Sequence, residues 1–137
     1  MEGTAIFDLL DLPTLYGIHM VSAQEGLAAG IEGHLARTTD GGQRWTYEKI
    51  EADPPIVDPL FEVERAGDMD WAVGAAGEVV NRSGGTGAWK RAQMGQDVLT
   101  WLRGISFSDP QNGWIVGGYG LIYRTTDGGK SWLPSQG

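Results

Sequence analysis

The chain has 137 residues, 41% of them hydrophobic, and a formal net charge of −8. This length suits one ordinary domain, and no apolar run approaches the roughly 18 residues of a membrane span. The negative charge argues against a nucleic-acid partner, because phosphate binding requires clustered Lys and Arg. Since the chain has no cysteine, disulfides, thiolate metal sites and cysteine nucleophiles are excluded.

Residues 1–14 contain one short apolar run, residues 5–10, which is long enough for a single strand. We expect this strand to act as a clasp that closes a ring of repeats, with Phe7 and Leu9 at an interface. The N-terminus lacks a basic region followed by an apolar region, so the sequence predicts no signal peptide.

The remainder of the chain is an internal repeat. Three tryptophans are separated by 44 and 43 residues, and three glycines are separated by the same two intervals. Two independent anchors with one period identify a repeat architecture. These anchors are Trp45, Trp89 and Trp132, and Gly30, Gly74 and Gly117.

Each repeat predicts four short strands, because alternating or wholly apolar runs are separated by glycine-rich turns. We expect the repeats at residues 15–57, 58–100 and 101–137. The expected strands are 17–22, 27–30, 35–38 and 45–50; then 61–66, 71–74, 78–81 and 89–93; then 104–108, 114–116, 121–124 and a short last one from Trp132. Four strands in a period of this length are typical of a β-propeller blade, so the predicted fold class is all-β.

Three blades alone would leave two sheet faces bare, which a protein in water must cover. Propellers usually have about 4–8 blades. We therefore expect oligomerisation to complete a closed ring, with two chains giving six blades or three chains giving nine. A different partner protein that supplies the missing blades is the alternative.

One eight-residue stretch occurs twice, at residues 38–45 and 125–132. Its Asp-Gly pair is a hairpin signal, and a carboxylate at such a turn accepts hydrogen bonds from nearby backbone N–H groups. The middle copy, residues 81–89, keeps its glycines and tryptophan but has no aspartate. We expect a structural role for Thr38, Asp40, Gly42 and Trp45, and for Thr125, Asp127, Gly129, Ser131 and Trp132.

The stretch is similar to the Asp-box, or BNR, repeat, with the pattern Ser/Thr-x-Asp-x-Gly-x-Thr/Ser-Trp; only Arg44 departs from it. The longer run GISFSDPQNGWIVGGYGLIYRTTDGGKSW resembles the photosystem II assembly and stability factor family (Ycf48-like, HCF136-like), and this resemblance extends over residues 15–137. Members of that family are seven-bladed, usually exported, non-enzymatic assembly factors. The resemblance implies a scaffold for protein–protein binding and an extracytoplasmic location, periplasmic or extracellular.

Asp-box blades also occur in sialidases, so a glycan-binding or sialidase-like glycan-processing propeller is the alternative function. Such an enzyme needs an arginine cluster, a tyrosine nucleophile and acidic partners. The sequence shows no recognisable arginine constellation, and we expect no enzyme activity. The candidates for these roles are Tyr16, Tyr47, Tyr119 and Tyr123, with Arg65, Arg82 and Arg103.

Other polar groups favour structural roles. His19 and His34 lie in neighbouring strands of the first blade, but no third ligand has suitable spacing, so no metal or other cofactor is expected. Residues 68–70, Asp-Met-Asp, lack the rest of a calcium loop and are expected to cap a turn. Trp101 has no counterpart in the other repeats, which makes it a candidate interface residue.

Overall fold

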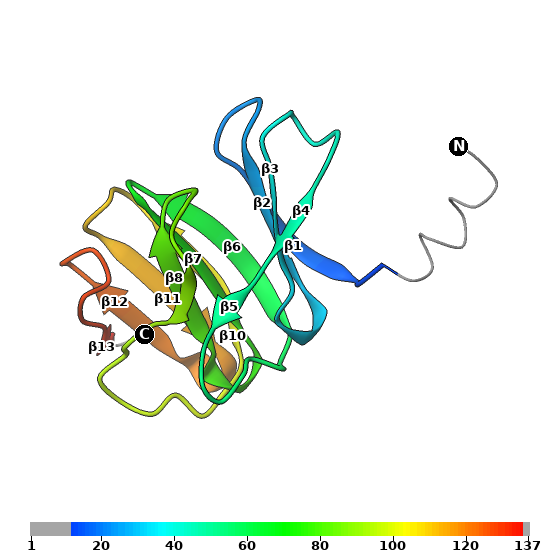
Figure 1. The fold of residues 1–137 in the computed structure, drawn as a ribbon. Helices are drawn as coiled ribbons and strands as arrows, with labels where there is room; N and C mark the ends of the chain where they lie inside the picture. Colours follow the sequence, from blue (N-terminus) through cyan, green and yellow to red (C-terminus); the bar gives the residue numbers. More distant parts are fainter. Residues whose placement is uncertain (1–11, 136–137) are drawn as a thin grey trace.

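The computed structural model describes residues 12–135. Figure 1 shows three sheets that follow one another along the chain, from blue and cyan through green to yellow and orange. The expected all-β fold of four-stranded antiparallel repeats is confirmed. Phe7 and Leu9 lie outside the described residues.

The first sheet has the order β1-β2-β3-β4, with each strand antiparallel to the next. Its strands are β1 (Leu15–Met20), β2 (Gly26–Gly30), β3 (Leu35–Thr38) and β4 (Thr46–Glu48). A short 3-10 turn, η1 (Ile31–Gly33), joins β2 to β3. The first strand begins two residues earlier than expected, and its pairing shifts between Leu15 and Gly17.

The second sheet has five strands, in the order β5-β9-β8-β7-β6. They are β5 (Ile50–Glu51), β6 (Leu60–Ala66), β7 (Met69–Gly74), β8 (Val79–Ser83) and β9 (Trp89–Arg91), with η2 (Ala75–Gly77) between β7 and β8. The expected single strand at residues 45–50 was wrong, because the chain leaves the first sheet after Glu48. It then pairs in parallel with β9 through Ile50 and Glu51, which ties the first repeat to the second.

The third sheet repeats the plan with the order β10-β11-β12-β13. Its strands are β10 (Leu102–Phe107), β11 (Gly113–Gly117), β12 (Ile122–Thr125) and β13 (Leu133–Pro134), with η3 (Gly118–Gly120) after β11. The last strand is short, and Pro134 lacks the N–H that a further strand would need.

The core lies between the sheets. One buried cluster joins the first sheet to the second through Leu27, Ala29 and Leu35 on one side and Val63, Ala72, Val80 and Trp89 on the other. A second cluster joins the second sheet to the third through Trp71, Val73 and Val79 and through Ile105, Ile115, Tyr123 and Trp132. The second sheet therefore presents one face to the first sheet and the opposite face to the third.

Candidate functional site

The two Asp-box turns have nearly the same hydrogen bonds. In the first, the Thr38 hydroxyl donates to Asp40 Oδ1 at 2.9 Å, and the Gly42 and Arg44 amides donate to Thr38 Oγ1 and Asp40 Oδ1, both at 2.9 Å. In the second, Thr125 Oγ1 lies 2.8 Å from Asp127 Oδ1, and Gly129 and Ser131 supply the equivalent amides. The carboxylates are thus occupied by their own turns.

The second turn has one additional bond, because Ser131 stands where the first turn has Arg44. The Ser131 hydroxyl donates to Asp127 Oδ2 at 2.6 Å. This hydroxyl, the Ser131 amide and the Thr125 hydroxyl lower the pKa of Asp127 to about 2. The Arg44 amide and the Thr38 hydroxyl lower the pKa of Asp40. Both aspartates are only partly buried, so their bonding holds a surface turn and does not line a closed site.

The turn of the second sheet is built differently, and sequence reasoning missed how. Asp70, expected to cap a turn, is fully buried in β7. It lies opposite Arg82 of β8, and Arg82 Nε donates to Asp70 Oδ2 at 2.9 Å. In the other sheets the same register position pairs Gly26 with Thr38 and Gly113 with Thr125. An Asp–Arg ion pair therefore replaces the Asp-box threonine and its glycine neighbour.

The ion pair continues across the junction between the first two sheets. Arg65 donates to Asp70 at 2.6 Å and to both Glu25 carboxylate oxygens at 2.8 Å, while Arg37 Nε donates to Glu25 Oε2 at 3.0 Å. Hydrogen bonding by Arg65, with a smaller contribution from Arg37, lowers the pKa of Glu25 to about 2. Together with Glu48, the network contains three arginines and three carboxylates, so its charges balance and it links two blades without offering net charge to a ligand.

At its other end, the network includes Glu48, which pairs with Arg82. Its Oε1 accepts from Arg82 Nη1 at 2.8 Å and from the Trp89 indole at 3.2 Å, and the Arg82 guanidinium lies 4.6 Å from the Trp89 ring centre. Trp132 occupies the Trp89 position in the third sheet, but its buried Nε1 has no hydrogen-bond partner among residues 12–135. Two features of the sequence could have revealed this network. The middle repeat has no aspartate in its turn, and it has Asp70 and Arg82 where the other repeats have glycine and threonine.

The candidate sialidase residues do not form an arginine cluster. Arg65 and Arg82 are engaged with carboxylates, and Arg103 lies 4.5 Å above the Phe61 ring. Tyr16 packs edge-on against the same Phe61 at 5.6 Å. Tyr16, Phe61 and Arg103 occupy the irregular positions of the inner strands β1, β6 and β10, where the pairing register shifts. They form a row in which Phe61 contacts both of its neighbours, which is a packing arrangement between strands.

The histidines are placed by backbone and aromatic contacts. His34 Nδ1 lies 2.6 Å from the Ile31 carbonyl oxygen, and the imidazole packs edge-on against Tyr47 at 5.7 Å. In the described part of the chain, no three His, Asp or Glu side chains are grouped as metal ligands. The helices that the structure describes include none with the length and apolar character of a membrane span.

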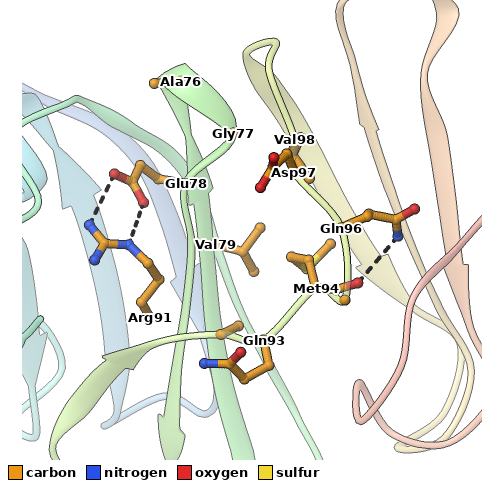
Figure 2. Close-up of a pocket in the computed structure, with 12 residues that line it drawn as sticks. Ala76, Gly77, Glu78, Val79, Arg91, Gln93, Met94, Gln96, Asp97 and Val98 are labelled. Atoms are coloured by element: carbon orange, nitrogen blue, oxygen red, sulfur yellow. Dashed lines mark hydrogen bonds and ion pairs between the residues drawn. The ribbon is translucent and has the colours of Figure 1, made fainter.

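A pocket of about 510 Å³ lies between β8, β9 and the segment that leads to the third sheet (Figure 2). Glu78 and Arg91 pair on one side of it, with Arg91 Nε 3.0 Å from Glu78 Oε1, and Met94 and Val98 lie on the other. Arg91 also donates to the Pro54 carbonyl oxygen at 3.0 Å. Of the charged groups that line the pocket, Glu78 and Arg91 pair with each other, and Asp97 lies beside Val98 on the opposite side (Figure 2).

Trp101, the expected interface residue, is half-exposed, and two exposed apolar residues lie close to it in the chain or in the adjoining turn. Leu99 and Tyr119 are both at the surface, and Tyr119 is 99% exposed. Tyr119 is held outward in the η3 turn at φ 61°. The Trp101 carbonyl accepts from the Gly118 amide at 3.0 Å, and a Cβ at Gly118 would meet the Trp101 indole. We call Leu99, Trp101 and Tyr119 the aromatic patch.

No family model matches the chain. Its sequence is 23% identical over 123 residues to the photosystem II assembly lipoprotein Ycf48 of Synechococcus sp. (strain CC9902). This alignment covers 86% of this chain and 35% of that protein. It is 38% identical over 47 residues to the chloroplastic photosystem II stability/assembly factor HCF136 of Cyanidioschyzon merolae (strain NIES-3377 / 10D). This alignment covers 34% of this chain and 11% of that protein.

Two solved structures have the same fold. Ycf48 bound to a D1 peptide matches with a TM-score of 0.78 and 24% identity, over 89% of this chain and 40% of that one. Ycf48 from Cyanidioschyzon merolae matches with a TM-score of 0.76 and 22% identity, over 89% and 39%. The chain thus spans well under half of the relatives it matches. The propeller fold and the resemblance to Ycf48-like assembly factors are confirmed.

The expected extracytoplasmic location, periplasmic or extracellular, is corrected by the same comparisons. The relatives from Cyanidioschyzon merolae and Guillardia theta are chloroplastic factors, and the relative from Synechococcus is a photosystem II assembly lipoprotein. The expectation followed the export of family members in general, and these relatives do not support it.

Proposed function

We propose that this chain is a non-enzymatic propeller scaffold that binds a segment of another protein through the aromatic patch. The observation that carries the proposal is the exposure of Leu99, Trp101 and Tyr119 at one end of the third sheet. Exposed tryptophan and tyrosine supply large contact area at low entropic cost and dominate binding energy at protein interfaces. The relative whose structure contains a D1 peptide makes that peptide the first partner to test.

The scaffold in this proposal consists of blades at residues 15–57, 58–100 and 101–137, preceded by the segment 1–14. The Asp-box residues have a structural role in it. Support comes from the hydrogen bonds that these carboxylates accept within their own turns, Asp127 through both oxygens and Asp40 through Oδ1.

Fluorescence anisotropy with a labelled D1 peptide tests the binding proposal. We expect Trp101→Ala and Tyr119→Ala each to raise the Kd tenfold or more, which corresponds to about 1.4 kcal/mol. Tyr119→Ala keeps the turn intact, because Ala76 holds the same left-handed position in η2 at φ 58°. Val57→Ala, at an exposed residue of the segment between the first two blades, is the matched control.

Two results would contradict the proposal separately. A peptide that does not bind the unmodified chain would remove D1 as the partner. Binding that both patch variants leave unchanged would remove the patch as the site.

Self-association is the second part of the proposal. We infer that the two sheet faces left bare among residues 12–135 are covered by further copies of the chain, with two or three chains completing one ring. Large apolar side chains are exposed at both ends of the stack of sheets, including Ile18 at one end and Leu133 at the other. Soluble monomers seldom leave such patches in contact with water.

A further inference from the structure

We infer that two copies of this chain join head to tail, with the open face of the first sheet packed on the open face of the partner's third sheet. This inference rests on the proposed self-association and specifies its geometry. The open face of the first sheet, called the leading face, contains Ile18, Ala28 and Trp45. The open face of the third sheet, called the trailing face, contains Trp114, Val116 and Ile122.

The leading face repeats a surface that is buried twice within the chain. Ile18 pairs with Ala28 in β1 and β2, as Val63 pairs with Ala72 and Ile105 with Ile115. Val63 and Ile105 are 3% and 8% exposed because a preceding sheet covers them, whereas Ile18 is 64% exposed. Trp45 is only half-buried, and a pocket of about 290 Å³ opens beside it, Ile18 and Ala28.

The trailing face repeats the complementary surface. By the strand register, Trp114 and Val116 correspond to Trp71 and Val73 of the second sheet. Val73 is fully buried against the following sheet, whereas Val116 is 43% exposed. Trp114 is covered only partly, by the Arg124 guanidinium 5.5 Å from its ring centre. The two open faces are therefore the two halves of a junction that the chain already builds between its sheets.

The junction between the second and third sheets shows what the contact would contain. Trp71 packs against Trp132 edge-on at 5.6 Å and against Phe107 at 5.7 Å. In a head-to-tail contact, Trp114 of one copy would take the place of Trp71. Trp45 and Met20 of the other copy would take the places of Trp132 and Phe107. Met20 is exposed and unbranched, and methionine makes favourable contacts with aromatic rings.

A glycine supports the pairing of these faces. At the internal junction Trp71 lies so close to the following Asp-box turn that a Cβ on Gly129 would overlap its ring, and the φ of 88° at Gly129 also favours glycine there. Gly42 is the equivalent residue of the first turn, and a Cβ there would meet only its own Trp45, at 3.9 Å. At the junction between the first two sheets, the smaller Leu27 stands at the position of Trp71, and Thr86 stands at the position of Gly129. The first turn, in which Gly42 has φ 92°, thus leaves room for a tryptophan, and Trp114 of the trailing face is the candidate to fill it.

The number of copies follows from ring closure. A contact between two different faces closes into a ring when the rotation per blade completes a turn, and otherwise extends into a filament. Two chains give six blades, which lies within the usual range of about 4–8, whereas three chains give nine. The usual number of blades therefore favours two copies over three.

Disulfide trapping tests the geometry, because the chain has no cysteine of its own. Ile18→Cys and Val116→Cys replace exposed residues on the two faces. The residues that correspond to Ile18 and Val116 lie in the same buried cluster at each internal junction. They are Val63 and Ala29 at the first junction, and Ile105 and Val73 at the second. Mild oxidation of the mixed variants should give a disulfide-linked pair with one chain of each kind, identified by its mass, and neither variant alone should cross-link to itself.

Light scattering and a control complete the test. The unmodified chain should have twice the mass of the 14.8 kDa monomer. A Val57→Cys variant, off both faces, should cross-link with neither of the others. A monomeric mass would overturn self-association itself and mean that other blades or another protein cover these faces. A two-chain mass with self-linked Ile18→Cys or Val116→Cys would overturn only the head-to-tail geometry. Peptide binding by the aromatic patch is measured separately and survives either result.

Discussion

Asp70 and Arg82 face each other across β7 and β8, with Arg82 Nε 2.9 Å from Asp70 Oδ2. Both side chains are almost completely buried. In the neighbouring sheets the same positions hold glycine and threonine, and the threonine hydroxyl supports an Asp-box turn. The second blade has thus exchanged a local turn for a charged link that reaches Glu25 and Glu48 in the first blade.

Asp70→Ala should destabilise the chain strongly. It would leave Arg82 buried without its carboxylate and would remove one partner of Arg65, and breaking a buried pair in this way costs about 3–5 kcal/mol. Urea unfolding, followed by tryptophan fluorescence, measures the change. Asp68→Ala, at an exposed residue two positions away, should stay within about 0.5 kcal/mol. Equal effects of the two substitutions would contradict the role of Asp70.

Asp70→Gly combined with Arg82→Thr should be less destabilising than the sum of the two single changes. The double variant restores the glycine–threonine pair of the other sheets and removes both buried charges together. For residues in contact, a coupling energy of about 1–3 kcal/mol is expected. A double-mutant cycle in urea gives this value, and strict additivity would show that the pair acts as two independent residues.

The repeat explains which parts of this structure were predictable. Strand number, sheet order and the Asp-box turns follow from a period that is visible in Trp45, Trp89 and Trp132, because each blade repeats one local pattern. The parallel strand β5 and the Asp70 network were not predicted. Strand β5 and the links from Arg65 to Glu25 and from Arg82 to Glu48 join neighbouring blades, so these partners lie far apart in the sequence and leave no local pattern in it.

The candidate site was predictable only in part. The absence of a counterpart for Trp101 in the other repeats identified it as unusual, and it is half-exposed. Tyr119 resembles an ordinary hairpin residue, because three Gly-x-x-Gly turns look alike in sequence. Its exposure follows from the left-handed backbone of η3, a conformation that the identity of the residue does not reveal.

Asp127→Ala should lower the thermal unfolding midpoint, with an effect that depends on pH. The pKa of Asp127 is about 2 in the folded chain and 3.8 for an unperturbed aspartate, so its contribution to stability is present above pH 3.8 and is lost as the pH falls through about 2. Melting curves of the unmodified chain and the variant should therefore differ at pH 7 and converge towards pH 2. Asp97→Ala, at an exposed residue outside the turn, is the control. A difference that is constant from pH 7 to pH 2 would contradict this origin.

Ala92→Glu should stabilise the third blade, because it supplies a missing acceptor. Trp89 donates its indole N–H to Glu48, whereas the buried Trp132 Nε1 has no partner in the described part of the chain. Ala92 is the residue of the second blade that corresponds to Glu48 of the first. Glu48 pairs with Leu35, and the Ala92 amide donates to the carbonyl of Val79, which corresponds to Leu35. A new hydrogen bond to a buried donor contributes about 0.5–1.5 kcal/mol. Gln93→Glu adds the same charge one residue away, where the side chain is exposed. If both substitutions change the free energy of unfolding equally, the gain would come from net charge, and the unpaired indole would carry no measurable cost.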